Sequence, residues 1–187
     1  MKCKKMKITL LSLVVAVFTI VAQNTVAYYT TTGSAINVVT SGNISAQIIE
    51  KMGDSDFPQE GVYVMPGSVI SKKVSVINTG NHPFWLRVKI TNFIDDEALS
   101  PDIVELDFNL DDWINGEDGF YYYKDEVKPG AETEKLFSQV KIAGNVDNAY
   151  LNKTVHLNVL AYAVQSENNG TSPLNAAGWP REGGDEI

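Results

Sequence analysis

The clearest pattern along the chain is the alternation of apolar and polar side chains at residues 84–91. Phe84, Leu86, Val88 and Ile90 are apolar, and arginine, lysine and threonine follow at positions 87, 89 and 91. Successive side chains of a strand point to opposite faces of a sheet. The alternation therefore predicts a half-buried strand of an antiparallel sheet.

Further β-rich segments recur along the chain between turn signals such as Pro66-Gly67 and Pro129-Gly130. They occupy residues 36–39, 44–49, 62–65, 68–78, 104–110, 119–123, 136–142 and 155–164. No stretch keeps an apolar period of 3.6 residues with caps, so we expect only short helices. The pattern predicts an all-β protein, an antiparallel β-sandwich of seven to nine strands. Jelly-roll and immunoglobulin-like topologies both remain open.

The N-terminal segment has the three parts of an export signal. Residues 1–7 carry four lysines and no acid, residues 8–22 are mostly apolar, and the small-x-small triplet 25–27 precedes Tyr28. A membrane anchor is the alternative, but the apolar run is shorter than the roughly 20 residues of a spanning helix. We therefore expect residues 1–27 to be a signal peptide cleaved between Ala27 and Tyr28. A single sandwich domain over 28–165 and a flexible acidic tail over 166–187 would follow.

Charge and cysteine content narrow the function classes. The chain has 15 basic and 23 acidic side chains, and the predicted signal peptide holds four of the lysines and the single cysteine, Cys3. The exported part would then have a net charge of −12 and no thiol, so it would fold without disulfides. An acidic chain lacks the basic patches that bind nucleic acid or anionic lipid. We expect a secreted protein that meets a membrane only during export.

Four segments, residues 25–35, 37–44, 64–90 and 161–166, carry a family resemblance. The most specific is P-G-x-x-x-x-K-x-V-x-V-x-N-T-G-N at 66–81, and the first pairs a small-residue exit with the aromatic Tyr28. Together they resemble the SipW-dependent secreted proteins of Gram-positive bacteria, the group around TasA and camelysin. The resemblance implies processing by a SipW-type signal peptidase and a jelly-roll-like sandwich deposited in the biofilm matrix or at the cell surface.

The same resemblance implies self-assembly into fibres, in which the N-terminal segment of one copy adds a strand to the next copy. That donor strand would lie within residues 28–40 and include Ala35, Ile36, Val38 and Val39. The partners would be further copies of the chain and other matrix proteins.

Candidate chemistry is sparse. The resemblance to camelysin suggests a secreted metalloprotease. A common type of zinc protease uses a His-Glu-x-x-His motif, and neither His82 nor His156 lies in one. Asp107, Asn109 and Asp111 alternate as in a calcium loop, although an EF-hand glycine is lacking. We therefore expect no enzyme activity and assign no catalytic, cofactor or metal residue.

Two aromatic side chains are candidates for exposed contacts with sugars or proteins. Tyr122 lies on the face opposite Tyr121 and Tyr123, and Trp85 lies opposite Phe84 and Leu86. Burial between packed layers is the alternative for both. The sequence thus favours a self-assembling matrix or surface protein, with a monomeric adhesin or ligand-binding module as the rival.

Overall fold

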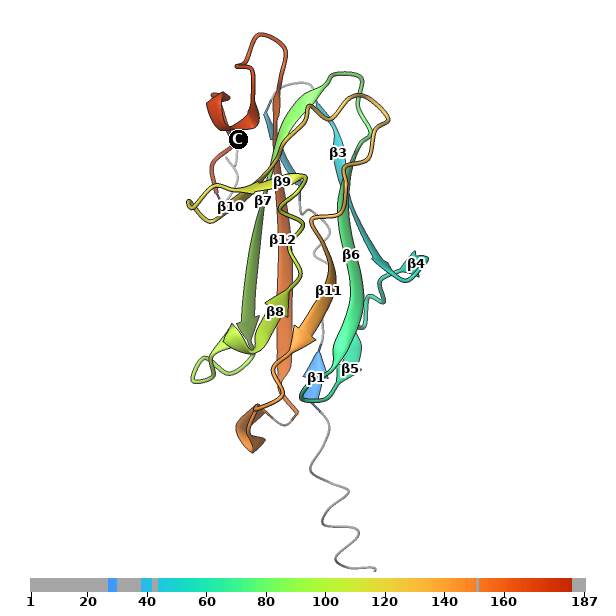
Figure 1. The fold of residues 1–187 in the computed structure, drawn as a ribbon, viewed down its shortest axis with the longest axis vertical. Helices are drawn as coiled ribbons and strands as arrows, with labels where there is room; N and C mark the ends of the chain where they lie inside the picture. The colour runs from blue at the N-terminus through green and yellow to red at the C-terminus, as the bar shows by residue number, and fades with distance from the viewer. Residues whose placement is uncertain (1–26, 30–37, 42–43, 151, 183–187) are drawn as a thin grey trace, which may run out of the picture.

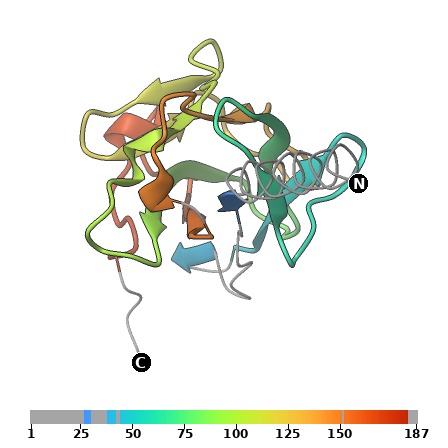
Figure 2. The same ribbon diagram turned by 90° about the horizontal axis from the view of Figure 1, so that it is seen from below.

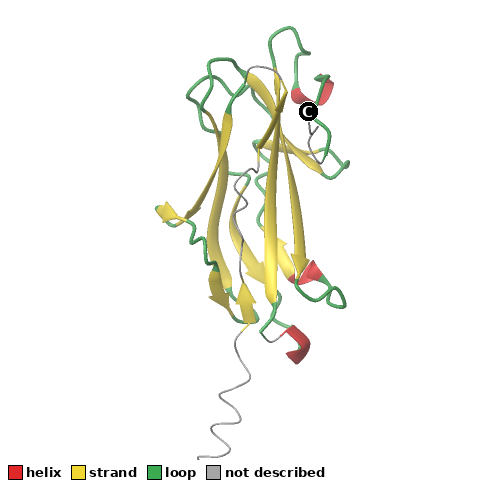
Figure 3. Ribbon diagram, turned by 180° about the vertical axis from the view of Figure 1, so that it is seen from behind, coloured by secondary structure: helices red, strands yellow, loops and turns green. Residues whose placement is uncertain are grey.

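The computed structural model describes residues 27–29, 38–41, 44–150 and 152–182. The described strands form two sheets that pack face to face, and the long strands follow the long axis of the molecule (Figures 1 and 3). Apart from strands, these described residues contain three short 3₁₀ turns, at Pro101–Ile103, Asn148–Tyr150 and Pro173–Asn175. The prediction of an all-β sandwich is confirmed. The predicted signal peptide, residues 1–27, lies outside the described residues except for Ala27.

The larger sheet has the strand order β5-β1-β12-β7-β10-β9, and β2 also pairs with β12. Its strands are β1 (Ala27–Tyr29), β2 (Val38–Ser41), β5 (Val62–Val64), β7 (Phe84–Ile94), β9 (Trp113–Asn115), β10 (Phe120–Tyr123) and β12 (Thr154–Gln165). The centre of this sheet is the antiparallel ladder of β7 and β12, which runs from the Gln165–Phe84 pair to the Val155–Ile94 pair. The strand predicted at 84–91 forms most of β7.

The smaller sheet has the strand order β4-β3-β6-β11-β8. Its strands are β3 (Ala46–Met52), β4 (Ser55–Asp56), β6 (Val69–Asn78), β8 (Val104–Leu106) and β11 (Phe137–Ile142). All its ladders are antiparallel, and the register of β11 on β6 shifts between Phe137 and Gln139. The edge strands β4 and β8 have only two and three residues, and such short edges limit unwanted pairing with other chains.

The core lies between the sheets, which enclose a common interior in the end-on view of Figure 2. Phe84, Leu86 and Val88 of β7 alternate inward as predicted and are almost completely buried. They meet the inward side chains of β6 and β11, such as Val76 and Val140. Burying such aliphatic and aromatic side chains stabilises the fold by about 1.5–3 kcal/mol each.

The strands are more numerous than predicted, and several of them are very short. The described residues form twelve strands instead of seven to nine, and five of the twelve have only two or three residues. The strand predicted at 104–110 ends at Leu106. After it, the side-chain oxygen of Asn109 accepts hydrogen bonds from the backbone N–H groups of Asp111 and Asp112. Such an Asx-type turn competes with continued strand pairing. No helix in the described part of the chain is long and apolar enough to cross a membrane.

Candidate functional site

The N-terminal part of the chain lies along one edge of β12. Tyr28 and Tyr29 of β1 pair in parallel with Thr154 and Val155 near the start of β12. Val38 to Ser41 of β2 pair, also in parallel, with residues 161–164 near its end. These are the two parallel ladders among the described strands, and they lie at the two ends of the side of β12 that faces away from β7.

The two donor-strand residues that the structure describes point to opposite faces of the larger sheet. Val38 is half-buried against the main core, and Val39 packs on a second apolar cluster on the outer face. Thr40 is exposed. The other two predicted donor residues, Ala35 and Ile36, lie outside the described residues. The prediction of a β-strand at Val38 and Val39 is confirmed, whereas strand donation between copies stays a prediction.

The two N-terminal strands differ in how firmly the sheet holds them. β1 is paired on both sides, because Ala27, Tyr28 and Tyr29 also form an antiparallel ladder with Val64, Tyr63 and Val62 of β5. Among the described residues β2 pairs with β12 alone. The expected cleavage bond, between Ala27 and Tyr28, lies within β1. β2 is therefore the outermost strand at the end of the sheet where β12 finishes.

Trp85 and Tyr122 are not the exposed aromatic residues that the sequence suggested. Both point to the outer face of the larger sheet, but their exposed fractions are only 8% and 6%. Phe120, Tyr122 and Tyr162 form a small apolar cluster there, joined by Trp179. The prediction of exposure was wrong because the chain after β12 returns over this face.

That returning segment, residues 166–182, was expected to be a flexible tail. In the structure the Trp85 indole N–H donates to the Asn169 carbonyl at 2.9 Å, and the Asn169 side chain bonds both ways with the backbone of Ala177. Trp179 lies edge-on to Tyr122, with ring centres 5.9 Å apart. The segment therefore forms a strap over the outer face, seen at the red end of the chain in Figure 1.

Two basic residues of β7 hold the end of the strap. The guanidinium of Arg87 lies over the rings of Phe120 and Trp179 and donates to the Pro180 carbonyl at 3.3 Å. Lys89 forms an ion pair with Glu182 at 2.6 Å. Both basic groups, the Arg87 guanidinium and the Lys89 amine, are thus paired with other residues of the same chain.

A tyrosine–carboxylate pair lies at the edge of the same cluster. The Tyr122 hydroxyl donates to Asp118 at 2.7 Å. Burial acts to raise the pKa of Asp118, but hydrogen bonds from Tyr122 and the Phe120 backbone N–H leave that pKa below its ordinary value. Burial and this same hydrogen bond raise the pKa of Tyr122. Tyr122 is therefore a neutral hydrogen-bond donor to Asp118 at neutral pH.

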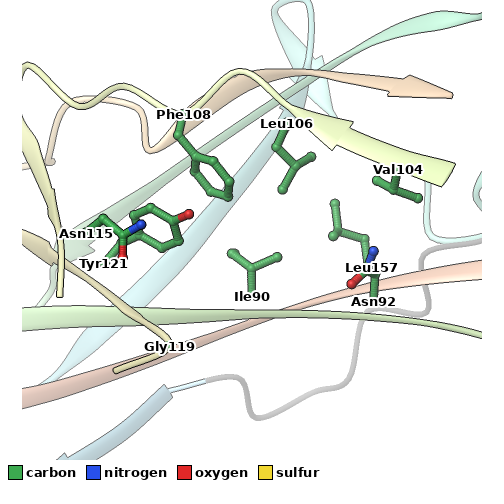
Figure 4. Close-up of a pocket in the computed structure, with 9 residues that line it drawn as sticks. All are labelled: Ile90, Asn92, Val104, Leu106, Phe108, Asn115, Gly119, Tyr121 and Leu157. Atoms are coloured by element: carbon green, nitrogen blue, oxygen red, sulfur yellow. The ribbon is translucent and has the colours of Figure 1, made fainter. Parts of the chain in front are cut away.

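A pocket of about 360 Å³ opens between the two sheets, where β8 stands opposite β7, β10 and β12 (Figure 4). It is lined by Ile90, Asn92, Val104, Leu106, Phe108, Asn115, Gly119, Tyr121 and Leu157. Phe108 and Tyr121 stack with ring centres 4.1 Å apart and form one wall. No pattern in the sequence indicated this pocket, because its lining comes from five separate segments.

The two histidines lie at opposite ends of the larger sheet. His156 is opposite Phe93 in the β7–β12 ladder, while His82 precedes Phe84, which is opposite Gln165 at the far end. Nine residues of strand separate the two positions, which is about 30 Å. The pair cannot share one metal ion, and the described residues contain no group of three His, Cys, Asp or Glu placed to bind one.

Two aspartate side chains, Asp107 of the suggested calcium loop and Asp95 directly after β7, have structural partners. One Asp107 oxygen accepts hydrogen bonds from the backbone N–H groups of Ser138 and Gln139, at 2.9 and 2.6 Å. Asp95 bonds His156 at 2.6 Å, which holds the pKa of Asp95 below its ordinary value. His156 in turn stacks on Phe93. These carboxylates connect strands and loops to one another.

No protein-family model, curated protein or solved structure matches this chain.

Proposed function

We propose that this chain is a non-enzymatic structural protein of the bacterial extracellular matrix or cell surface that assembles into fibres by strand addition. It would belong to the SipW-dependent group around TasA and camelysin, be processed by a SipW-type signal peptidase, and have further copies and other matrix proteins as partners. The observation that carries the proposal is β2, a four-residue N-terminal strand lying parallel to the end of β12.

β2 has the properties of a strand that can be exchanged. Its ladder with β12 spans four residue pairs, and parallel pairing is slightly less stable per residue than antiparallel pairing. The β2 strand of a second copy would place the same valines against the same neighbours. Exchange would therefore cost little in contacts, and head-to-tail exchange that does not close into a ring produces filaments.

Net charge sets the conditions for this assembly. The exported part would carry a charge of −12 and repel other copies at neutral pH. Added salt screens this repulsion, and mild acid reduces it. We expect filaments to form more readily under both conditions.

Cysteine cross-linking tests the exchange directly. Val38 lies opposite Ala161 in neighbouring strands, which are about 4.8 Å apart and within the range that a disulfide spans. Residues 28–187 contain no native cysteine. The oxidised double variant Val38→Cys/Ala161→Cys should stay monomeric under filament-forming conditions and form filaments after reduction. Negative-stain electron microscopy of the exported protein gives the readout.

The reciprocal experiment mixes the two single variants. Strand donation predicts disulfide-linked dimers of Val38→Cys with Ala161→Cys in filaments and none in dilute monomer. The pair Ser71→Cys/Gln139→Cys, which are opposite each other in β6 and β11 of the smaller sheet, is the matched control and should not block assembly. Filaments formed by the oxidised Val38/Ala161 variant would contradict strand addition through β2. A wild-type protein that stays monodisperse in salt and mild acid would contradict the structural function.

A further inference from the structure

The pocket between the sheets has the chemistry of a ligand site. Its volume of about 360 Å³ lies in the range of about 300–1,000 Å³ that is typical of small-molecule sites. Ile90 and Leu157 of the larger sheet face Val104 and Leu106 of β8 across the pocket, and the stacked rings of Phe108 and Tyr121 lie beside them (Figure 4). None of the nine lining residues is charged, so the lining favours a neutral ligand over an anion or a cation.

Three polar groups in the pocket retain hydrogen-bonding capacity. The Asn92 amide N–H donates to the Pro101 carbonyl at 2.9 Å, which leaves its oxygen as an acceptor. The Asn115 oxygen accepts from the Glu117 backbone N–H at 3.0 Å, which leaves its NH₂ group as a donor. The Tyr121 hydroxyl has no hydrogen-bond partner among the described residues, and it can donate or accept.

These groups are spread along the pocket. Asn115 and the Tyr121 hydroxyl lie at one end, and Asn92 lies at the other (Figure 4). Asn92 is also out of pattern, because the inward positions before it on β7 are all apolar. A ligand that meets all three groups must be elongated, carry polar groups at both ends and have apolar faces between them.

We propose that this pocket binds a neutral glycan, about two sugar rings of which would lie between β8 and β10. A sugar ring presents C–H faces to the aliphatic side chains on the two sides of the pocket and to the aromatic wall. Its hydroxyl or acetamido groups donate and accept as the two amides and the phenol require. The proposal goes beyond the structural function above and does not depend on assembly. It would give a protein at the cell surface a contact with the surrounding polysaccharide.

Calorimetric titration of the exported protein with defined oligosaccharides tests the site. The probes are the tetramers of N-acetylglucosamine, as found in cell-wall glycan, and of glucose, as found in secreted polysaccharides. Preference for one of them identifies the source. We expect saturable binding of at least one probe, weakened about fivefold to tenfold by Tyr121→Phe and by Asn115→Ala, since each removes one hydrogen-bonding group.

The variants separate loss of the site from loss of the fold. Tyr121→Phe keeps the ring that stacks on Phe108, and Asn115 is exposed, so neither change should lower the thermal midpoint by more than a few degrees. Asn148→Ala, at an exposed position outside the pocket, is the matched control and should bind like the wild type. Equal binding by all three variants would overturn the assignment of the site. No binding of either tetramer up to about 10 mM would overturn the proposal.

Discussion

The guanidinium carbon of Arg87 lies 3.9 Å from the centre of the Phe120 ring, on the face of the larger sheet that points away from the core. The ring of Trp179 lies 4.8 Å from the same carbon. An arginine in contact with two aromatic rings gains from cation–π attraction and from packing of its planar group. Arg87 thus ties β10 and the C-terminal strap to β7, and the outer face acts as a second, smaller core.

Replacing Trp179 should release the strap without unfolding the sandwich. Trp179→Ala removes the ring that contacts Arg87 and Tyr122. Since Trp179 is only half-buried, we expect a loss of about 1–2 kcal/mol, below the cost of truncating a fully buried tryptophan. Limited proteolysis should cut the strap faster. Leu174→Ala, at an exposed position of the same strap, should change neither quantity. An unchanged cleavage rate in Trp179→Ala would show that the strap is held elsewhere.

The turn between β9 and β10 has no room for a side chain at Gly116. A Cβ atom there would come within 2.5 Å of a Tyr122 ring carbon and 2.6 Å of an Asp118 oxygen. Gly116→Ala should therefore displace the Tyr122–Asp118 pair and destabilise the protein by about 1–3 kcal/mol. Gly144→Ala meets nothing closer than 4.0 Å and should be nearly neutral. Urea unfolding of both variants gives the comparison, and equal midpoints would contradict the described turn.

A buried lysine in the smaller sheet depends on its carboxylate partner. Lys72 is completely buried, with its amine 3.0 Å from Glu50 and 4.1 Å from the centre of the Phe57 ring. Burial lowers the pKa of Lys72, and Glu50 opposes that shift. Glu50→Gln removes the opposing charge, and we expect it to cost about 1–3 kcal/mol, because a buried charge then loses its compensation.

The matched control for this change is an ion pair in solvent. Glu105 and Lys141 are 2.8 Å apart, and both side chains are more than half exposed. Glu105→Gln should change the free energy of unfolding by about 0–1 kcal/mol, as is usual for surface pairs. A similar effect of the two substitutions would mean that burial of Lys72 contributes little to the role of Glu50.

Acid should destabilise the fold through carboxylates that have hydrogen-bond partners. The Glu132 carboxylate accepts from Lys135 at 2.7 Å and from Ser75 at 2.5 Å, and these bonds lower the pKa of Glu132. The hydrogen bond with His156 likewise lowers the pKa of Asp95. A carboxylate with a lowered pKa in the folded state contributes stability above its unfolded pKa of about 4, and this contribution is lost as the pH falls through the folded pKa.

Urea midpoints measured from pH 7 down to pH 3 should therefore fall most steeply below about pH 4. Glu132→Gln should flatten this dependence, and Glu60→Gln, at an exposed position, should leave it unchanged. A midpoint that stays constant to pH 3 would contradict the role of these carboxylates. Assembly in mild acid is best tested above this range, where repulsion is reduced and the fold is intact.

The sequence predicted the strands whose two faces differ in character. β7 was predicted closely, because its inward positions face the core and its outward positions carry Arg87 and Lys89. β8 was predicted too long, since the apolar alternation continues through Phe108 and Leu110 while Asn109 turns the backbone. The alternation reports which side chains are apolar and which are polar, but it does not reveal a local hydrogen bond that ends the strand.

The strap could not be predicted for a different reason. The strap has the Asn-, Gly- and Pro-rich composition of a flexible tail, and its anchors, Asn169 and Trp179, are far from Trp85 and Arg87 in sequence. Trp179 was the available signal, as a large aromatic residue within a polar segment. A strand at Val38 and Val39 could be predicted from their β-branched character, whereas their parallel pairing with β12 depends on the tertiary fold.

The direction of β2 has a mechanical consequence. Because β2 runs parallel to the end of β12, a pull along a β2 strand donated to another copy, as proposed above, would be directed along the ladder. In a filament joined through this ladder, tension would load the inter-strand hydrogen bonds together in shear instead of opening them one after another. Such a joint resists a steady stretch better than peeling from one end, so the filament would be strong under tension along its axis and weaker where a strand end is lifted sideways.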